Sequence, residues 1–229
     1  MIQLVLTLFI LFIGLLTLCI LWRINSRKYI SSGTVASAYD AWTKDKLLER
    51  LWGEHIHLGF YATGKQNIDF REAKVQFVHK LVNWSGLDKL PKGSRILDVG
   101  CGIGGSSRIL AKYYGFNVTA ITISPAQVKR ARELTPSGLN CNFLVMDALD
   151  LKFEDGSFDA VWSVEAGAHM NDKNKFADEM LRILRPGGYL AIADWNSRDL
   201  RAYPPTFFEK LVLKQLLEQW VHPNFISIN

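Results

Sequence analysis

The chain has 229 residues, of which 48% are hydrophobic and 21% are charged, and this composition excludes an intrinsically disordered protein. Its formal net charge of +5 is modest and no long basic run occurs, so we expect no nucleic-acid partner. Cys19, Cys101 and Cys141 are too widely spaced for a disulfide framework or a zinc knuckle, and we expect no metal. A chain of this length has room for one domain of ordinary size and an appendage.

Residues 1–22 form an apolar segment without a charged side chain. About 20 apolar residues in a helix can cross a bilayer, and here the basic residues Arg23, Arg27 and Lys28 follow the segment, unlike in a cleaved signal peptide. By the positive-inside rule we predict a single-pass N-terminal membrane anchor, a lipid bilayer as a partner, and the remaining domain on the cytoplasmic side. Residues 23–33 are then a basic flank and linker. A buried helix of a soluble protein is the alternative.

Residues 34–94 are predicted to be a helical region that covers a substrate. Apolar residues recur at helical spacing over residues 35–51 and 70–84. The loop between these helices is dense in aromatic residues and histidines, and we expect it to close over a hydrophobic substrate, with a plain packing loop as the alternative. The predicted substrate contacts are Trp52, His55, His57 and Tyr61. The two histidines have no further ligands at the spacing of a metal site, which disfavours metal binding.

From Arg95 to the end of the chain, residues 95–229, strand and helix patterns alternate at first, which predicts a Rossmann-like α/β domain with helices on both faces of a parallel sheet. The five predicted strands are residues 96–99, 117–123, 141–146, 158–163 and 189–193. Ser124, Pro125 and Gln127 predict the capped start of the helix that follows the second strand.

A glycine-rich loop, Gly100–Gly105, separates the first strand from a helix, so that backbone N–H groups can meet the polar end of a nucleotide-like cofactor. Gly100, Gly102 and Gly105 also satisfy the dinucleotide fingerprint G-x-G-x-x-G. The acid that should hold the ribose about 20 residues later is missing, because the first acidic residue after Gly100 is Glu133. This absence disfavours a nicotinamide cofactor.

Three features favour S-adenosylmethionine instead. Asp98 precedes the glycines, and a carboxylate there suits a cationic cofactor with a free amino group. Asp147 and Ala148 follow the third strand, where an acid can accept a hydrogen bond from the adenine amino group. The sequence Pro-Gly-Gly at residues 186–188 forms a predicted turn into the fifth strand. At these spacings, the three together predict a methyltransferase.

Four stretches resemble the tocopherol-type class I methyltransferases: WGEHIHLGFY, LDVGCGIGGSSRILAKYYGFNVTAITISPAQV, FEDGSFDAVWSVEAGAHM and LRPGGYLAIADW. The resemblance implies C-methylation of the ring of a membrane-embedded prenyl-quinol, methyl-phytyl- or methyl-solanesyl-benzoquinol, in tocopherol or plastoquinone synthesis. The cofactor contacts that it implies are Asp98, Gly100, Gly102 and Gly104 at the methionine end, Ile123 and Ser124 at the ribose, and Asp147 and Ala148 at the adenine. Members of this family have a seven-stranded sheet, whereas nothing after the last predicted helix, residues 207–220, supplies the last two strands. The fifth strand is then expected to be an unpaired edge unless another segment covers it.

Glu165 and His169 follow the fourth strand, at the edge of the sheet where ligands gather. An aromatic carbon becomes nucleophilic when the neighbouring phenol loses its proton, so a base near that hydroxyl accelerates methylation. Four residues apart, the two side chains share one face if the segment is helical. We predict one of them as the catalytic base or quinol anchor, with His169 preferred because its reference pKa is near neutrality. His55 or His57 is the second choice.

The sequence leaves other interpretations open. Glu165 could instead bind the cofactor or cap a helix, with His169 merely packed. The substrate could be another lipid, such as a sterol or a fatty acyl chain. Because the end of the family's sheet is missing, the chain could also be a cofactor-binding remnant without catalytic activity.

Overall fold

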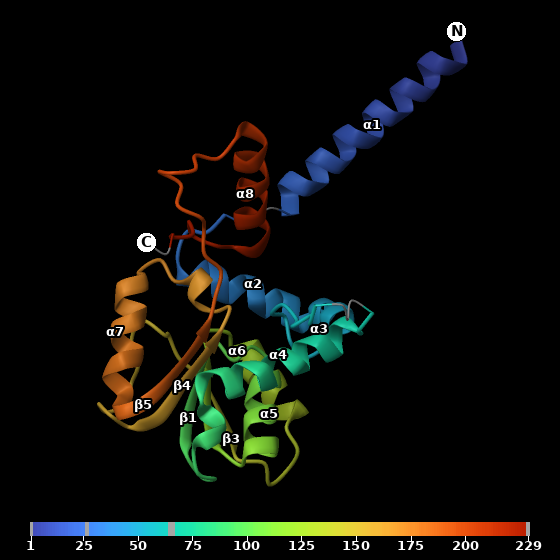
Figure 1. Ribbon diagram of the computed structural model, residues 1–229. Coiled ribbons are helices and arrows are strands. Elements are labelled where there is room, and N and C mark those ends of the chain that lie inside the picture. The colour runs from blue at the N-terminus through green and yellow to red at the C-terminus, as the bar shows by residue number, and fades with distance from the viewer. Residues whose placement is uncertain (1, 26–27, 64–66, 228–229) are drawn as a thin grey trace.

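A five-stranded parallel sheet lies at the centre of the computed structural model, which describes residues 2–25, 28–63 and 67–227 (Figure 1). Its strands are β1 (Arg95–Val99), β2 (Asn117–Thr122), β3 (Cys141–Val145), β4 (Phe158–Val164) and β5 (Leu184–Ala193). The order is β3-β2-β1-β4-β5, so β1 lies in the middle and pairs with both β2 and β4. The predicted Rossmann-like sheet is confirmed.

Both faces of the sheet are buried. Successive residues of a strand point to opposite faces, so two neighbouring residues of β1 belong to two different core clusters. In β1, Ile96 belongs to a core cluster with residues of α4 (Phe70–Ser85) and α5 (Gly105–Tyr114). Its neighbour Leu97 belongs to a second cluster with residues of α7 (Lys173–Ile183). Helices therefore cover both faces, as predicted (Figure 1).

The helix after β2, α6 (Pro125–Leu134), starts where the sequence predicts. The hydroxyl oxygen of Ser124 accepts a hydrogen bond from the backbone N–H of Gln127 at 3.1 Å. The Gln127 side chain does not complete a capping box, because its amide oxygen accepts from the Thr122 hydroxyl at 2.6 Å instead. Gln127 thereby joins the start of the helix to the end of β2.

The helix predicted over residues 35–51 is two helices. They are α2 (Ser32–Lys44) and α3 (Leu47–Trp52). Lys46 interrupts the path with a φ of +56°, and a carboxylate oxygen of Asp45 holds the break by accepting from the backbone N–H of Leu47 at 2.8 Å. The predicted linker also ends earlier than expected, because Ser31 already caps α2.

The N-terminal helix α1 (Ile2–Asn25) projects away from the sheet and its covering helices (Figure 1). A membrane-spanning helix needs about 20 consecutive apolar residues. Across the residues that the structure describes, no helix is both long and apolar enough to cross a membrane. The predicted single-pass anchor, and with it the placement of the domain on the cytoplasmic side, is therefore wrong. Arg27 of the predicted basic flank lies outside the described residues.

The fifth strand begins earlier than predicted. β5 starts at Leu184 and includes the Pro-Gly-Gly sequence, which was expected to form a turn before it. A shift of register opposite residues 158–160 and a φ of +74° at Gly187 accommodate the extra residues. Among the described residues, β5 pairs with β4 alone and forms an edge of the sheet. The remaining helical elements are the short turns η1 (Leu87–Lys89) and η2 (Gly167–His169) and the helix α8 (Phe207–Trp220), the last as predicted.

Candidate active site

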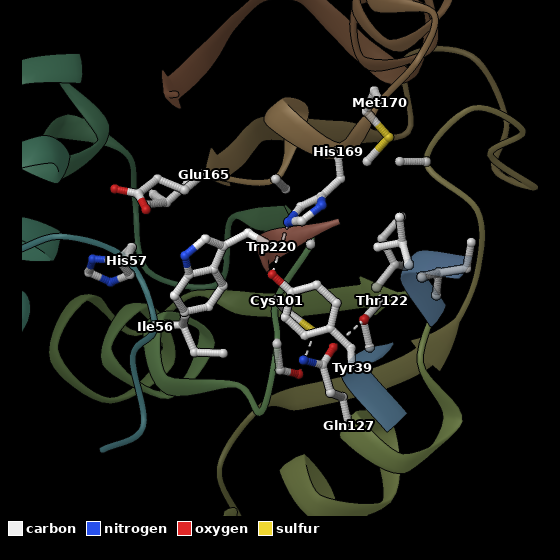
Figure 2. A pocket seen from close by; sticks show the side chains of 18 of the residues that line it. Tyr39, Ile56, His57, Cys101, Thr122, Gln127, Glu165, His169, Met170 and Trp220 are labelled. Carbon is white, nitrogen blue, oxygen red and sulfur yellow. Dashed lines mark hydrogen bonds between the residues drawn. The ribbon is translucent and has the colours of Figure 1, made fainter. Parts of the chain in front are cut away.

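A cavity of about 340 Å³ opens at the carboxyl ends of the strands (Figure 2). Residues that follow β1 to β4 form what we call its sheet side; they include Gly100, Ile123, Asp147 and Glu165. Residues from α2, from the loop after α3, and from the end of α8 to Phe225 form what we call its helical side. The cavity therefore lies where ligands bind in open α/β sheets.

The glycine loop lines the sheet side of the cavity and leaves open space there. Gly100 and Gly102 have φ values of +79° and +55°, in the left-handed region that favours glycine. A Cβ atom on Gly100 would lie 2.2 Å from the Cβ of Ala166, so no larger residue fits there. A Cβ on Gly102 would meet no atom closer than 4.0 Å, which leaves room above the loop. Gly104 does not line the cavity and instead precedes α5.

Two acidic side chains line the sheet side, as predicted. Asp98 is almost fully buried and accepts a hydrogen bond from the Ser107 hydroxyl at 2.5 Å. Burial raises the pKa of Asp98 to about 7, although the bond from Ser107 acts in the opposite direction. Asp147 accepts from the backbone N–H of Leu149 at 2.9 Å, and Ala148 beside it also lines the cavity. Carboxyl groups at both places suit a cationic ligand that carries hydrogen-bond donors.

Besides Gly104, two further residues that were predicted to contact ligands do not line the cavity. Ser124 is fully buried behind the cavity wall, where its hydroxyl donates to a carboxylate oxygen of Asp40 at 2.5 Å. That bond joins α6 to α2, so Ser124 links the two sides of the cavity. Tyr61 is about half exposed and is not among the lining residues.

The loop after α3 is fixed as a wall of the helical side. The ammonium group of Lys74 in α4 donates to the backbone carbonyls of Trp52 at 3.1 Å and His55 at 2.8 Å. Glu54 forms an ion pair with Arg108 at 2.7 Å. Because these bonds come from α4 and α5, both packed on the sheet, the loop is held relative to the sheet side.

The two histidines of this loop hydrogen-bond each other, with Nε2 of His57 3.1 Å from Nδ1 of His55. Burial lowers the pKa of His55 to about 3 and that of His57 to about 4, so both are neutral at physiological pH. The described side chains include no group of three or more potential metal ligands. These histidines are buried parts of the wall, and their hydrogen bonds run to each other and to the backbone carbonyl of Leu58.

His169 and Tyr39 meet inside the cavity. His169 ends η2 after β4, and Tyr39 comes from α2, yet Nε2 of His169 lies 2.9 Å from the Tyr39 hydroxyl oxygen (Figure 2). The ring of His222 stacks on that of His169, with a centroid separation of 4.1 Å. Burial is the larger cause that lowers the pKa of His169 to about 3, and the neighbouring His222 acts in the same direction. Burial also raises the pKa of the Tyr39 hydroxyl above its usual range. The pair is therefore neutral, and its hydrogen bond is partly buried.

Glu165 occupies a different place from His169. It has a φ of +54°, which is rare for a residue other than glycine, and η2 begins only after it, so the expected shared helical face does not exist. Its carboxylate accepts from the backbone N–H of Leu58 at 3.0 Å, and burial raises its pKa. Glu165 thus contacts the loop of the helical side while lining the cavity.

Sequence reasoning missed several residues of the helical side, of which three matter most for the chemistry. They are Tyr39, Trp220 and His222. The Trp220 ring lies edge-on to the rings of Trp42 at 5.8 Å and of Trp52 at 6.4 Å, which produces an aromatic wall from three distant segments. A local pattern could at most have flagged the His-Pro sequence after the last helix, because none of these contacts is local in sequence.

Comparison with known proteins places this geometry in context. Residues 97–192 match the family model described as a methyltransferase domain. The chain is 60% identical over 208 residues to the 2-methyl-6-phytyl-1,4-hydroquinone methyltransferase of Synechocystis sp., covering 91% of this chain and 65% of that protein. It is 42% identical over 193 residues to the chloroplastic tocopherol O-methyltransferase of Arabidopsis thaliana, covering 79% and 56%. The chain thus spans less than two thirds of the length of these relatives. A solved structure, a putative sarcosine dimethylglycine methyltransferase from Galdieria sulphuraria, matches with a TM-score of 0.69 and 27% identity over 81% of this chain and 69% of that one.

Proposed function

Since this chain carries a class I, S-adenosylmethionine-dependent methyltransferase domain, we propose that it methylates a ring carbon of a prenylated quinol of the methyl-phytyl-benzoquinol class. The observation that carries this proposal is the Tyr39–His169 hydrogen bond in a cavity whose helical side is largely aromatic. It provides a proton-accepting pair where a phenol must lose its proton. The 60% identity to a protein named for this substrate supports the substrate class.

The residues of the sheet side fit S-adenosylmethionine. The open space beside Gly102 and the buried Asp98 carboxyl group suit its methionine end. Asp147 and Ala148 suit its adenine. Ile123, which lines the cavity between them along the strand ends, suits the ribose. When bound, this cofactor supplies an electrophilic methyl group on a sulfonium centre.

The helical side fits an aromatic ring with an apolar tail. Trp52 and Trp220 present rings to the cavity, and Ile56 and Leu216 add aliphatic surface beside them. Such a wall buries apolar surface at about 25 cal/mol per Å² and excludes water from the reacting groups. A prenylated quinol supplies both the ring and the apolar chain that this wall favours.

Tyr39 and His169 would act as a proton relay. A quinol hydroxyl placed at Tyr39 gives its proton to the tyrosine oxygen, while Tyr39 gives its own proton to a ring nitrogen of His169. The resulting phenolate spreads its charge onto the neighbouring ring carbon, which becomes nucleophilic. After the methyl group is transferred, this carbon releases its proton to solvent, and the relay returns its proton to the ring oxygen. General base catalysis of this kind contributes about 10²–10⁴-fold to a rate. The wall held by Lys74 and Glu165 keeps the quinol aligned during the transfer.

Two measurements on the full chain test the proposal. Calorimetric titration with S-adenosylhomocysteine measures whether the sheet side binds its cofactor product. An assay with labelled S-adenosylmethionine and a panel of prenyl-quinols, sterols and fatty acyl lipids in detergent measures transfer. We expect binding together with label on methyl-phytyl-benzoquinol.

The other outcomes separate the alternatives. Label on a sterol or fatty acyl lipid, with none on any quinol, would replace the proposed substrate class. Binding without transfer to any member of the panel would indicate a cofactor-binding protein without catalytic activity.

A further inference from the structure

The residue after α8 has an unusual backbone conformation. Val221 has φ and ψ of +57° and +45°, a left-handed conformation that β-branched residues rarely adopt. A left-handed residue often ends a helix, but glycine or asparagine usually takes that position. Val221 is fully buried in a small apolar cluster with Val35 and Ala38 of α2. The surrounding structure therefore holds Val221 in a conformation that its side chain disfavours, and such strain tends to occur at functional sites.

In this conformation the Val221 carbonyl oxygen lies 3.3 Å from Nδ1 of His169. A backbone carbonyl accepts hydrogen bonds and cannot donate them, so Nδ1 must carry a proton for this bond to form. Because the ring is neutral when its pKa is near 3, it holds one proton in total. Nε2 is then the unprotonated nitrogen, 2.9 Å from the Tyr39 oxygen, and it accepts a hydrogen bond from that hydroxyl.

The neighbours of His169 agree with a neutral ring. His222 stacks on it from the same C-terminal segment, and a charged His169 would repel a proton on that ring. Lys173 of α7 donates to the carbonyl of Gly167 at the start of η2, and its positive charge also disfavours an imidazolium. Tyr39 faces Nε2 from α2. Among the groups on these elements, the Val221 carbonyl is the acceptor that selects between the two neutral tautomers.

We propose that Val221 is a positioning residue: its left-handed backbone fixes His169 as the Nδ1–H tautomer and leaves Nε2 free to receive the Tyr39 proton. The catalytic consequence depends on the proposed function, whereas the tautomer itself does not. The segment after α8 thus contributes to the proton relay through its main chain, which explains why no side-chain motif marks it.

Nuclear magnetic resonance of the full chain with ¹⁵N-labelled histidine tests the tautomer directly. The His169 signals are assigned by their loss in His169→Gln. We expect the pattern of an Nδ1–H ring at pH 7.5, and an Nε2–H pattern would overturn the proposal. This measurement requires no turnover. If the Nδ1–H pattern appears but the unmodified chain methylates no quinol, the tautomer assignment stands and the proposed function fails.

Two variants test the role of the backbone. Val221→Gly reaches a φ of +57° without strain, so we expect it to keep the Nδ1–H pattern. Val221→Pro fixes φ near −65° and turns the carbonyl away, so we expect loss of that pattern and a decrease in kcat of about 10²-fold. Unchanged S-adenosylhomocysteine affinity in Val221→Pro shows that the sheet side remains folded. If Val221→Pro retains both the Nδ1–H pattern and the kcat of the unmodified chain, the proposal is wrong. If this variant does not fold, the spectrum of the unmodified chain decides whether His169 is the Nδ1–H tautomer.

Discussion

The two sides of the cavity are built in different ways. The sheet side takes its lining from the ends of adjacent strands, with Asp98, Ile123 and Asp147 supplied by consecutive β-α units. The helical side assembles α2, the loop after α3 and the segment after α8, which are far apart in the chain. Local backbone geometry therefore specifies the sheet side, whereas long-range docking of side chains specifies the helical side. Changes to the two sides should separate cofactor binding from methyl transfer.

The largest separation is expected at His169. Replacing it with Gln removes the proton acceptor for Tyr39, and we predict a decrease in kcat of about 10²–10⁴-fold. S-adenosylhomocysteine affinity should change little, because Asp98 and Asp147, the predicted cofactor contacts, lie at the ends of β1 and β3, whereas His169 follows β4. His79→Gln is a matched control, since Nδ1 of His79 lies 2.8 Å from the Tyr114 hydroxyl but neither residue lines the cavity. Equal losses in both variants would show that a tyrosine–histidine bond is merely structural here.

Gly100→Ala should damage the sheet side through packing. A left-handed alanine costs about 1–2 kcal/mol of unfolding free energy, and overpacking against Ala166 adds about 1–3 kcal/mol. Gly93→Ala has a similar φ of +84° but meets no atom within 4 Å, so it reports the backbone cost alone. Denaturant unfolding measures both variants. Equal destabilisation of the two variants would mean that Ala166 moves aside, and that the close contact does not restrict the residue at position 100.

The next largest effect concerns the sheet side, where the affinity for the cofactor should depend on pH through Asp98. Burial raises the pKa of Asp98 to about 7, and a cationic cofactor favours its carboxylate. The affinity for S-adenosylmethionine should therefore rise with pH, by up to about tenfold per unit below pH 7, and level off above it. Calorimetry between pH 5.5 and 8.5 measures this profile, and Asp98→Asn should flatten it. An unchanged slope in Asp98→Asn would assign the titration to another group.

The smallest effect concerns the bond between the two sides. Ser124→Ala removes an N-cap, at about 1 kcal/mol, and also the donor to Asp40, at about 1 kcal/mol more. Asp172→Ala removes the N-cap of α7, which accepts from the backbone N–H of Lys175, and so measures a cap alone. Thermal unfolding should show the larger loss for Ser124→Ala. If the two losses match, the link to Asp40 contributes nothing to the docking of α2.

This contrast also explains what the sequence could predict. The five strands, the glycine loop and the capped start of α6 follow from patterns within a few residues, and all appear in the structure. Of the proposed relay, only His169 could be predicted, because it follows β4. Tyr39 gives no signal of its own, since its place beside His169 depends on α2 crossing the sheet edge. The break at Lys46 and the backbone of Val221 likewise depend on contacts that no local pattern records.

A double-mutant cycle on Tyr39 and His169 tests the relay most directly. The rates of methyl transfer in Tyr39→Phe, His169→Gln and the double variant are compared with that of the unmodified chain at saturating cofactor. If the two residues act as one unit, the double variant is no slower than the slower single variant, because either change already breaks the relay. If the two losses multiply instead, Tyr39 and His169 act independently and the relay does not exist.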